Sequence, residues 1–187
     1  MSKYYYLVAG LPELTLEDSK LSYTVADFKS ELYSALSEED RMLIDLFYLQ
    51  FDNANVLKLL KDKDAAIDPR GNYSAEELAE YISLLKEGGE VSERMFPSYL
   101  STFISEYFNI SVEDDFLHED RLAALYYAYA MKCKNKFVSA WFSFNLVINN
   151  VLVALTARKF KVDIARFVES VAVPRKIMMM VRAGSAV

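Results

Sequence analysis

The chain has 187 residues, of which 53% are hydrophobic and 14% aromatic, so it is too apolar to be intrinsically disordered. Its 5 glycines and 4 prolines provide too little turn chemistry for a many-stranded β fold. A net charge of −6 argues against a nucleic-acid binder, whose affinity depends on neutralising phosphates. We therefore expect an all-α multi-helix bundle, with residues 1–187 forming a single helical domain.

Apolar residues at helical spacing, together with capping signals, predict a series of helices. A capping signal is a Ser or Thr followed three residues later by an acidic residue, and it occurs at Thr24, Ser37 and Ser74. The expected helices lie at about residues 26–36, 42–60, 75–87, 97–108, 118–134 and 137–157, followed by a last one that reaches Val171.

Three stretches interrupt or obscure this pattern. Residues 4–9 are apolar and suit either a strand or a first helical turn. Asp52 or Asn53 is a candidate break within the second predicted helix. Residues 62–73 contain an Asp-Pro-Arg-Gly-Asn run and predict a loop.

Residues 137–157 carry no charge and are long enough to span a bilayer. They also include Asn145, Asn149 and Asn150, each of which would need a hydrogen-bond partner in hydrocarbon. A central helix that is buried on all sides explains this composition without a membrane. We therefore expect a buried core helix, with a membrane span as the alternative.

The chain has one cysteine, and its N-terminus lacks the long apolar run of a secretory signal. An intrachain disulfide is excluded, and both features suit a reducing compartment. We expect a cytoplasmic protein.

A shift of 95 residues brings two helical stretches into register. The matched pairs are Phe47 with Phe142, Asn55 with Asn150, Leu60 with Leu155 and Lys63 with Arg158. Each stretch contains an Asn, then apolar residues at helical spacing, then a cation. Two pseudo-repeats, at about 24–87 and 97–171, explain the pattern, and so does chance similarity between helices. Without a repeat, each Asn is a cap or a buried hydrogen-bonding group, and each cation complements a helix dipole.

Residues 51–63, Phe-Asp-Asn-Ala-Asn-Val-Leu-Lys-Leu-Leu-Lys-Asp-Lys, resemble the recurring motif of a family of V/A-type ATPase adaptors. Its members are designated C in V/A-type enzymes and d in eukaryotic V-ATPases, and we call it the C/d family. Its repeats carry an acidic residue, then Asn, then a helix that ends in basic residues. The matching residues here are Asp52, Asn55, Lys61 and Lys63. The second copy keeps Asn150 and Arg158 but has Val147 and Thr156 at the other two positions.

Residues 4–12, Tyr-Tyr-Tyr-Leu-Val-Ala-Gly-Leu-Pro, are similar to the start of an uncharacterised bacterial family encoded beside V-type ATPase subunits. Together the resemblances imply an all-helical, funnel-shaped adaptor without catalytic activity. Such an adaptor seats the central stalk on the proteolipid ring and transmits torque, so its partners are rotary ATPase central-stalk and proteolipid-ring subunits at the inner membrane. Members of the C/d family have three helical repeats, whereas this chain has room for about two. It is expected to be a reduced relative or part of a longer protein.

The sequence contains no phosphate-binding loop, dinucleotide fingerprint, zinc-protease motif or nucleophile elbow. His118 is the only histidine, and the acidic residues around it at 114–120 suit a solvated helix start better than a metal site. Cys133 lies among lysines but lacks a base and an orienting group. We expect no catalytic site, no cofactor and no metal.

Three functions remain open from the sequence. The first is the rotary-ATPase adaptor, and the second is a helical protein–protein interaction module unrelated to the ATPase. The third is a helical hydrolase or transferase that uses the carboxylates between residues 114 and 120.

Overall fold

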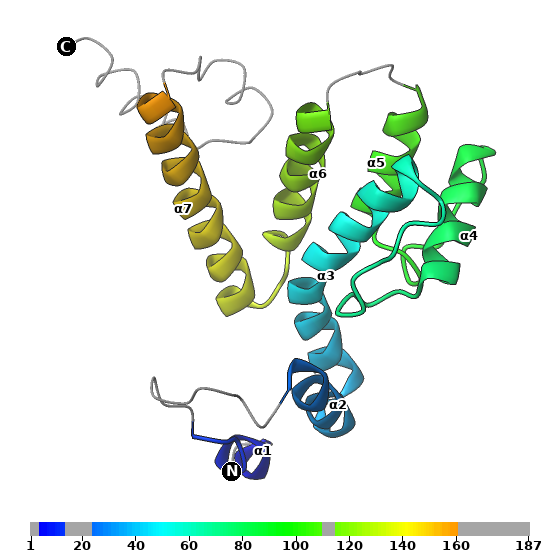
Figure 1. Cartoon of the computed structure of the whole chain (residues 1–187). Coiled ribbons are helices and arrows are strands. Elements are labelled where there is room, and N and C mark those ends of the chain that lie inside the picture. Colours follow the sequence, from blue (N-terminus) through cyan, green and yellow to red (C-terminus); the bar gives the residue numbers. More distant parts are fainter. Residues whose placement is uncertain (1–3, 14–23, 110–114, 161–187) are drawn as a thin grey trace.

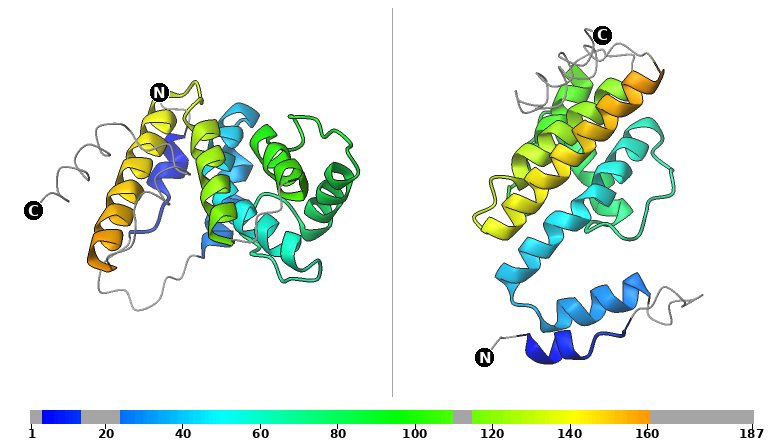
Figure 2. Two further views of the ribbon diagram at one scale, coloured as in Figure 1. Left: turned by 90° about the horizontal axis from the view of Figure 1, so that it is seen from above. Right: turned by 90° about the vertical axis from the view of Figure 1, so that its left-hand side faces the viewer.

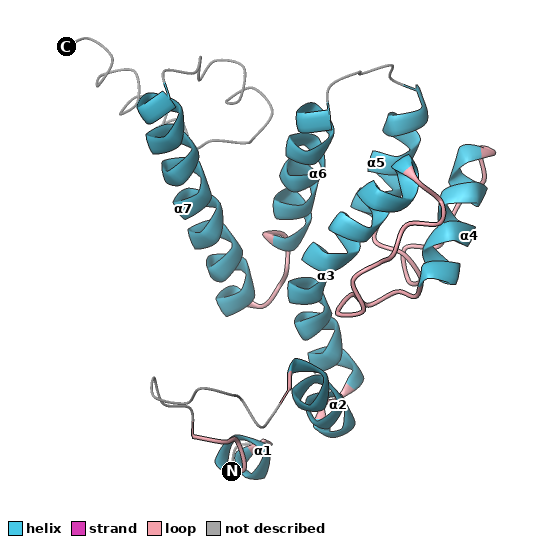
Figure 3. Ribbon diagram, viewed as in Figure 1, coloured by secondary structure: helices cyan, strands magenta, loops and turns pink. Residues whose placement is uncertain are grey.

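The computed structural model describes residues 4–13, 24–109 and 115–160, and in these ranges every regular element is a helix (Figures 1 and 3). The all-α prediction is confirmed. The helices are α1 (Tyr5–Ala9), α2 (Val25–Ala35), α3 (Glu38–Lys61), α4 (Ala75–Lys86), α5 (Ser98–Asn109), α6 (Asp115–Ala130) and α7 (Lys136–Phe160).

The three predicted capping signals are confirmed as helix N-caps. The side chains of Thr24, Ser37 and Ser74 each accept a hydrogen bond from the backbone N–H three residues later. At α2 and α4 the acidic residue at that position also accepts a hydrogen bond from the backbone N–H of the capping residue, which completes a capping box. Local sequence therefore fixes where α2, α3 and α4 begin.

The predicted break at Asp52 or Asn53 is wrong, because α3 runs without interruption from Glu38 to Lys61. Polar residues interrupt a helix when their side chains compete for its own backbone. Here they find partners outside the helix: Asn53 Oδ1, for example, accepts a hydrogen bond of 2.6 Å from the hydroxyl of Tyr99 on α5.

The apolar opening is helix α1 rather than a strand. The hydroxyl of Tyr4, just before α1, donates to the carboxylate of Asp40 in the first turn of α3. The expected end of the last helix at Val171 lies outside the described residues. So do residues 110–114 and 161–171 of the second predicted pseudo-repeat, and the repeats stay a prediction.

The helices pack in a sequential bundle (Figure 1). α5 lies between α4 and α6, α6 lies between α5 and α7, and α3 packs against both α4 and α6. A view from above shows the same order, with α4 and α7 at opposite edges (Figure 2). The described apolar side chains with less than 2% of their surface exposed are Val56, Leu78, Phe96, Leu100, Phe103, Ile104, Leu122 and Ala130.

Aromatic residues join the helices. Phe47 on α3 stacks on Phe142 of α7 with ring centroids 5.2 Å apart. These two phenylalanines are also a pair matched by the 95-residue shift. The hydroxyl of Tyr126 on α6 donates to the Leu46 carbonyl of α3 at 2.7 Å. Tyr99 and Tyr126 are both buried, with ring centroids 5.8 Å apart. The tyrosine and phenylalanine stripes thus serve mainly as core.

The prediction of a central helix buried on all sides is wrong for α7. Val138, Phe142 and Leu146 are buried against the bundle, but the opposite face of the helix is exposed. Residues 136–156 form a helix that is long and apolar enough to cross a membrane, and 22% of its apolar window is buried. Apolar composition and burial differ here because, among the described residues, α7 lies at an edge of the bundle and packs on α6 and on Phe47 of α3.

Loss of the α4 cap should weaken the fold by a predictable amount. Ser74→Ala removes the acceptor for the Glu77 N–H, so the free energy of unfolding should fall by about 1 kcal/mol in urea titrations. Ser83→Ala is the control, because Ser83 is exposed within the same helix and alanine favours helix there. Equal losses in the two variants would contradict the capping role.

Candidate functional site

The site that the sequence singled out centres on two polar residues of α3, Asp52 and Asn55, both with 0% of their surface exposed. They lie about one helical turn apart and face the loop of residues 62–74. Asp52 accepts hydrogen bonds from the Asn72 N–H at 2.9 Å and from the Tyr73 N–H at 3.2 Å. A carboxylate that accepts from two backbone donors holds the end of the loop just before α4 begins.

Asn55 holds the middle of the same loop. Its Oδ1 accepts from the Asp68 N–H at 2.7 Å, and its Nδ2 donates to the Asp68 carbonyl at 3.0 Å. One side-chain amide thus satisfies both backbone polar groups of a single loop residue. We call Asp52 and Asn55 together the loop clamp.

Gly71 lets the loop backbone come this close to α3. A Cβ at this position would overlap Asp52 Oδ1 and lie 3.2 Å from Asn55 Nδ2. Any larger residue would have to push the loop away from both members of the clamp. Glycine is required here for close approach rather than for an unusual φ.

Side chains from outside α3 fasten the outer side of the loop. Lys29 of α2 donates from Nζ to the carbonyls of Arg70 and Gly71 at 3.1 and 3.0 Å. The Arg70 guanidinium pairs with the Asp68 carboxylate and lies 4.2 Å from the ring centroid of Phe51. The loop clamp on α3 and Lys29 on α2 therefore bind the same loop, and this loop leads into α4.

Burial dominates the electrostatics of the clamp. Loss of hydration raises the pKa of Asp52 to about 6, although the N–H groups of Asn72 and Tyr73 and the charge of Lys29 act in the opposite direction. Hydrogen bonds from Arg70 lower the pKa of Asp68 to about 2. A carboxyl that titrates near neutrality can serve acid–base chemistry, but Asp52 is fully buried and occupied by backbone donors. Its geometry is that of a structural group.

The remaining motif residues are not part of the clamp. Lys61 and Lys63 are exposed at the end of α3 and just beyond it, and Arg158 is exposed near the end of α7. Asn150 is buried with 7% of its surface exposed, and its Nδ2 has no hydrogen-bond partner. The structure thus brings together Asp52 and Asn55 of the six predicted residues.

Sequence reasoning missed the partners of the clamp: Lys29, Asp68, Gly71 and Asn72. Residues 62–73 were correctly predicted as a loop, and the run Pro69-Arg70-Gly71-Asn72 marked its tight part. No local signal indicated which buried side chains of α3 would bind that backbone.

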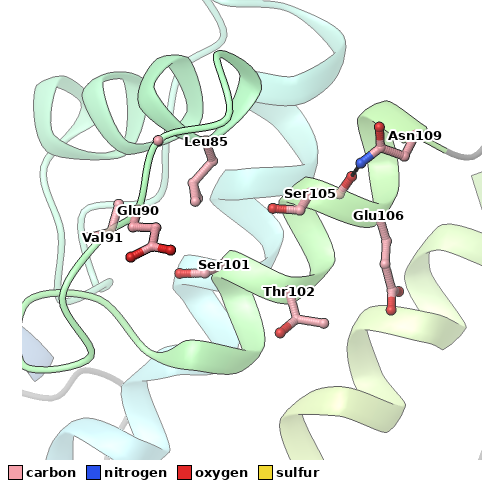
Figure 4. A pocket seen from close by; sticks show the side chains of 9 residues that line it. Leu85, Glu90, Val91, Ser101, Thr102, Ser105, Glu106 and Asn109 are labelled. Atoms are coloured by element: carbon pink, nitrogen blue, oxygen red, sulfur yellow. Dashed lines mark hydrogen bonds between the residues drawn. The ribbon is translucent and has the colours of Figure 1, made fainter.

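Two hollows lie near these elements. One, of about 430 Å³, borders the clamp and is lined by charged side chains, among them Lys29, Arg41, Asp45 and Glu93. The other, of about 550 Å³, lies between the end of α4 and α5, and Figure 4 shows Ser101, Ser105, Glu90 and Glu106 around it. Glu106 binds Arg121, and no histidine is among the described residues that line this hollow.

His118 packs against aromatic rings of α5. Its ring centroid lies 4.6 Å from that of Tyr107 on α5 and 6.3 Å from that of Phe103. Among the described residues, no group of three or more His, Cys, Asp or Glu side chains is arranged to hold a metal ion.

These features define an all-helical protein in which Asp52 and Asn55 hold the loop between α3 and α4. The chain belongs to the family described as "Protein of unknown function (DUF2764)", whose model matches residues 1–186. No curated protein and no solved structure matches the chain.

The two motif asparagines should respond differently to substitution. Asn55→Leu would leave the N–H and carbonyl of Asp68 facing an apolar side chain without partners, so the free energy of unfolding should fall by about 2–4 kcal/mol. Asn150→Leu removes an amide nitrogen without a partner, so the change should stay within about 1 kcal/mol. Chemical denaturation of both variants checks this, and equal losses would contradict the asymmetry.

The raised pKa of Asp52 should give a distinctive pH dependence. Because its folded-state pKa of about 6 exceeds the ordinary 3.8, the folded chain holds this proton more tightly than the unfolded chain does. The contribution of Asp52 to stability is therefore full below pH 3.8 and is lost as the pH rises through about 6. The free energy of unfolding of the wild type minus that of Asp52→Asn should therefore fall as the pH rises through this range.

Asp68→Asn is the matched control, with the opposite sign. The pKa of Asp68 is lowered to about 2, so its contribution is present above pH 3.8 and is lost as the pH falls toward 2. Urea midpoints across the pH range measure both effects. If the free energy of unfolding of the wild type instead rises relative to that of Asp52→Asn as the pH increases, the raised pKa of Asp52 is refuted.

Proposed function

We propose that the protein is a non-catalytic accessory subunit of a V/A-type rotary ATPase that couples the central stalk to the proteolipid ring. The observation that carries the proposal is the resemblance of residues 51–63 to the repeat motif of the C/d family. The acidic residue and the Asn of this motif are the two members of the loop clamp, and both are fully buried. The residues that carry the resemblance thus have a strong structural role, which is what a recurring scaffold motif requires.

The all-helical architecture and the exposed ends of α3 also support an adaptor. Lys61 and Lys63 lie where the resemblance expects basic residues, and both are exposed to a partner. The proposal places the protein in the cytoplasm, at the inner membrane through its partners.

A helical protein–protein interaction module unrelated to the ATPase is the second candidate. The exposed apolar face of α7 favours it, because a face of this kind fits a helical partner of any complex. The two candidates differ in the identity of the partner.

Affinity purification from native cells separates the candidates. The tagged full chain should recover central-stalk and proteolipid-ring subunits from detergent-solubilised membranes, quantified by mass spectrometry against an untagged control. The double variant Lys61→Glu with Lys63→Glu should reduce recovery about tenfold, the effect of losing about 1.4 kcal/mol of binding free energy. The double variant Lys132→Glu with Lys134→Glu, in the exposed turn between α6 and α7, makes the same change of charge; it is the matched control and should recover as much as the wild type.

Absence of ATPase subunits, with the bait folded and the ATPase expressed, would count against the adaptor and in favour of the interaction module. An equal loss of recovery with the Lys132→Glu and Lys134→Glu control would show that net charge, rather than the end of α3, governs binding.

A further inference from the structure

Seven large apolar residues lie exposed along one side of α7, and we call them the α7 seam. They are Phe137 (70% exposed), Trp141 (47%), Phe144 (60%), Ile148 (39%), Val151 (42%), Leu152 (55%) and Leu155 (58%). α7 lies at an edge of the bundle, and α6 packs on one side of it (Figures 1 and 2). The opposite side is buried where it carries Val138, Phe142 and Leu146, whereas Val153, farther along the same side, is 45% exposed.

The seam has the spacing of a coiled-coil interface. Six of its members follow one another at alternating steps of four and three, from Phe137 to Leu155. This repeat of 3.5 residues gives a narrow stripe suited to one partner helix, rather than the wider face of an ordinary amphipathic helix. Small residues, Ala140, Val147 and Ala154, recur every seven positions beside the stripe and let a second backbone approach.

We propose that the α7 seam binds the same seam of a second copy of this chain in an antiparallel pair centred on Ile148. Positions equally distant from Ile148 then face each other, so Trp141 lies opposite Leu155 and Phe144 lies opposite Leu152. The aromatic residues are all in the first half of the seam and the aliphatic ones in the second half. An antiparallel pair therefore matches large with smaller side chains, whereas a parallel pair would oppose Trp141 to itself.

The exposed area is what a stable pair needs. Applied to ordinary side-chain areas, the exposed fractions correspond to roughly 700 Å² of apolar surface per chain. This exceeds the largest apolar patch of a typical monomer, about 300–600 Å². Two copies would bury roughly 1,400 Å², within the range of about 1,200–2,000 Å² for specific interfaces.

A lipid surface fits the seam less well. A helix that lies on a membrane carries Lys and Arg along its polar face, whereas α7 has no charge between residues 137 and 157 and its other face is packed on the bundle. The cations lie at the helix ends, at Lys136, Arg158 and Lys159, so an antiparallel pair gathers like charges at each end. Added salt should therefore strengthen the pair, whereas it would weaken binding to an anionic membrane.

Sedimentation velocity of the full chain, at concentrations from nanomolar to about 100 µM, tests the proposal. Ile148→Glu sets two carboxylates against each other at the centre of the pair, so the dimer dissociation constant should rise by about 100-fold or more. Met95→Glu is the control, because Met95 is also an exposed apolar residue (58%, against 39% for Ile148) but lies outside α7, and it should dimerise like the wild type. Melting temperatures verify that both variants fold.

Disulfide trapping tests the direction of the pair. In a Cys133→Ser background, copies with Phe144→Cys are mixed with differently tagged copies with Leu152→Cys. The antiparallel register predicts mixed cross-links between the two kinds of copy, whereas a parallel pair would cross-link copies of one kind.

Three results would overturn the proposal: a monomer at every concentration, a dimer indifferent to Ile148→Glu, or cross-links only between copies of one kind. Trp141 is the only tryptophan, so its emission reports directly on the seam. A blue shift with phosphatidylcholine–phosphatidylglycerol vesicles, weakened by salt and shown by a monomeric protein, would identify lipid as the occupant instead.

Discussion

The fully buried carboxylate of Asp52 is the interaction on which the connection between α2, α3 and α4 depends. A charge removed from water costs far more than its hydrogen bonds return unless its oxygens are well occupied. The backbone N–H groups of Asn72 and Tyr73 supply that occupation, and the Lys29 ammonium compensates part of the charge from outside. The pKa of the carboxyl is nevertheless raised, because loss of hydration outweighs these hydrogen bonds and the charge of Lys29. Without Asp52, the loop loses the acceptor that orients its approach to α4.

The loop clamp also changes the meaning of the motif. In the sequence alone, an acidic residue, an asparagine and a basic helix end could be a binding site on a surface. In the structure the first two hold a loop, and only the basic end, Lys61 and Lys63, faces solvent. A scaffold motif of this kind is compatible with an adaptor, whose work is to transmit force through contacts. In the proposed adaptor, exposed surfaces such as the end of α3 would recognise the partners.

α7 shows how composition and position can diverge. A helix without charge over 21 residues satisfies the composition of a core helix, a membrane span and a helix-binding seam equally well. The buried side chains of Val138, Phe142 and Leu146 on one side, and the seven exposed residues of the α7 seam on the other, separate these cases. The 3.5-residue spacing of the exposed side was present in the sequence, but it could be recognised as a seam only once the other side was known to be occupied.

The sequence by itself determined the helical class, the N-caps at Thr24, Ser37 and Ser74, and the loop before α4. All of these depend on residues within a few positions of one another, where propensity and capping act directly. Tertiary structure decided which buried side chains meet which backbone groups. Asp52 finds donors 20 residues away, and Asn55 finds both of its partners 13 residues away, while Asn150, the same residue type in a similar sequence setting, has none for its Nδ2. Tertiary structure also decided that one face of α7 stays exposed. Burial depends on how many neighbours the packed bundle supplies, and in the described part of the chain α7 packs at the edge of the bundle.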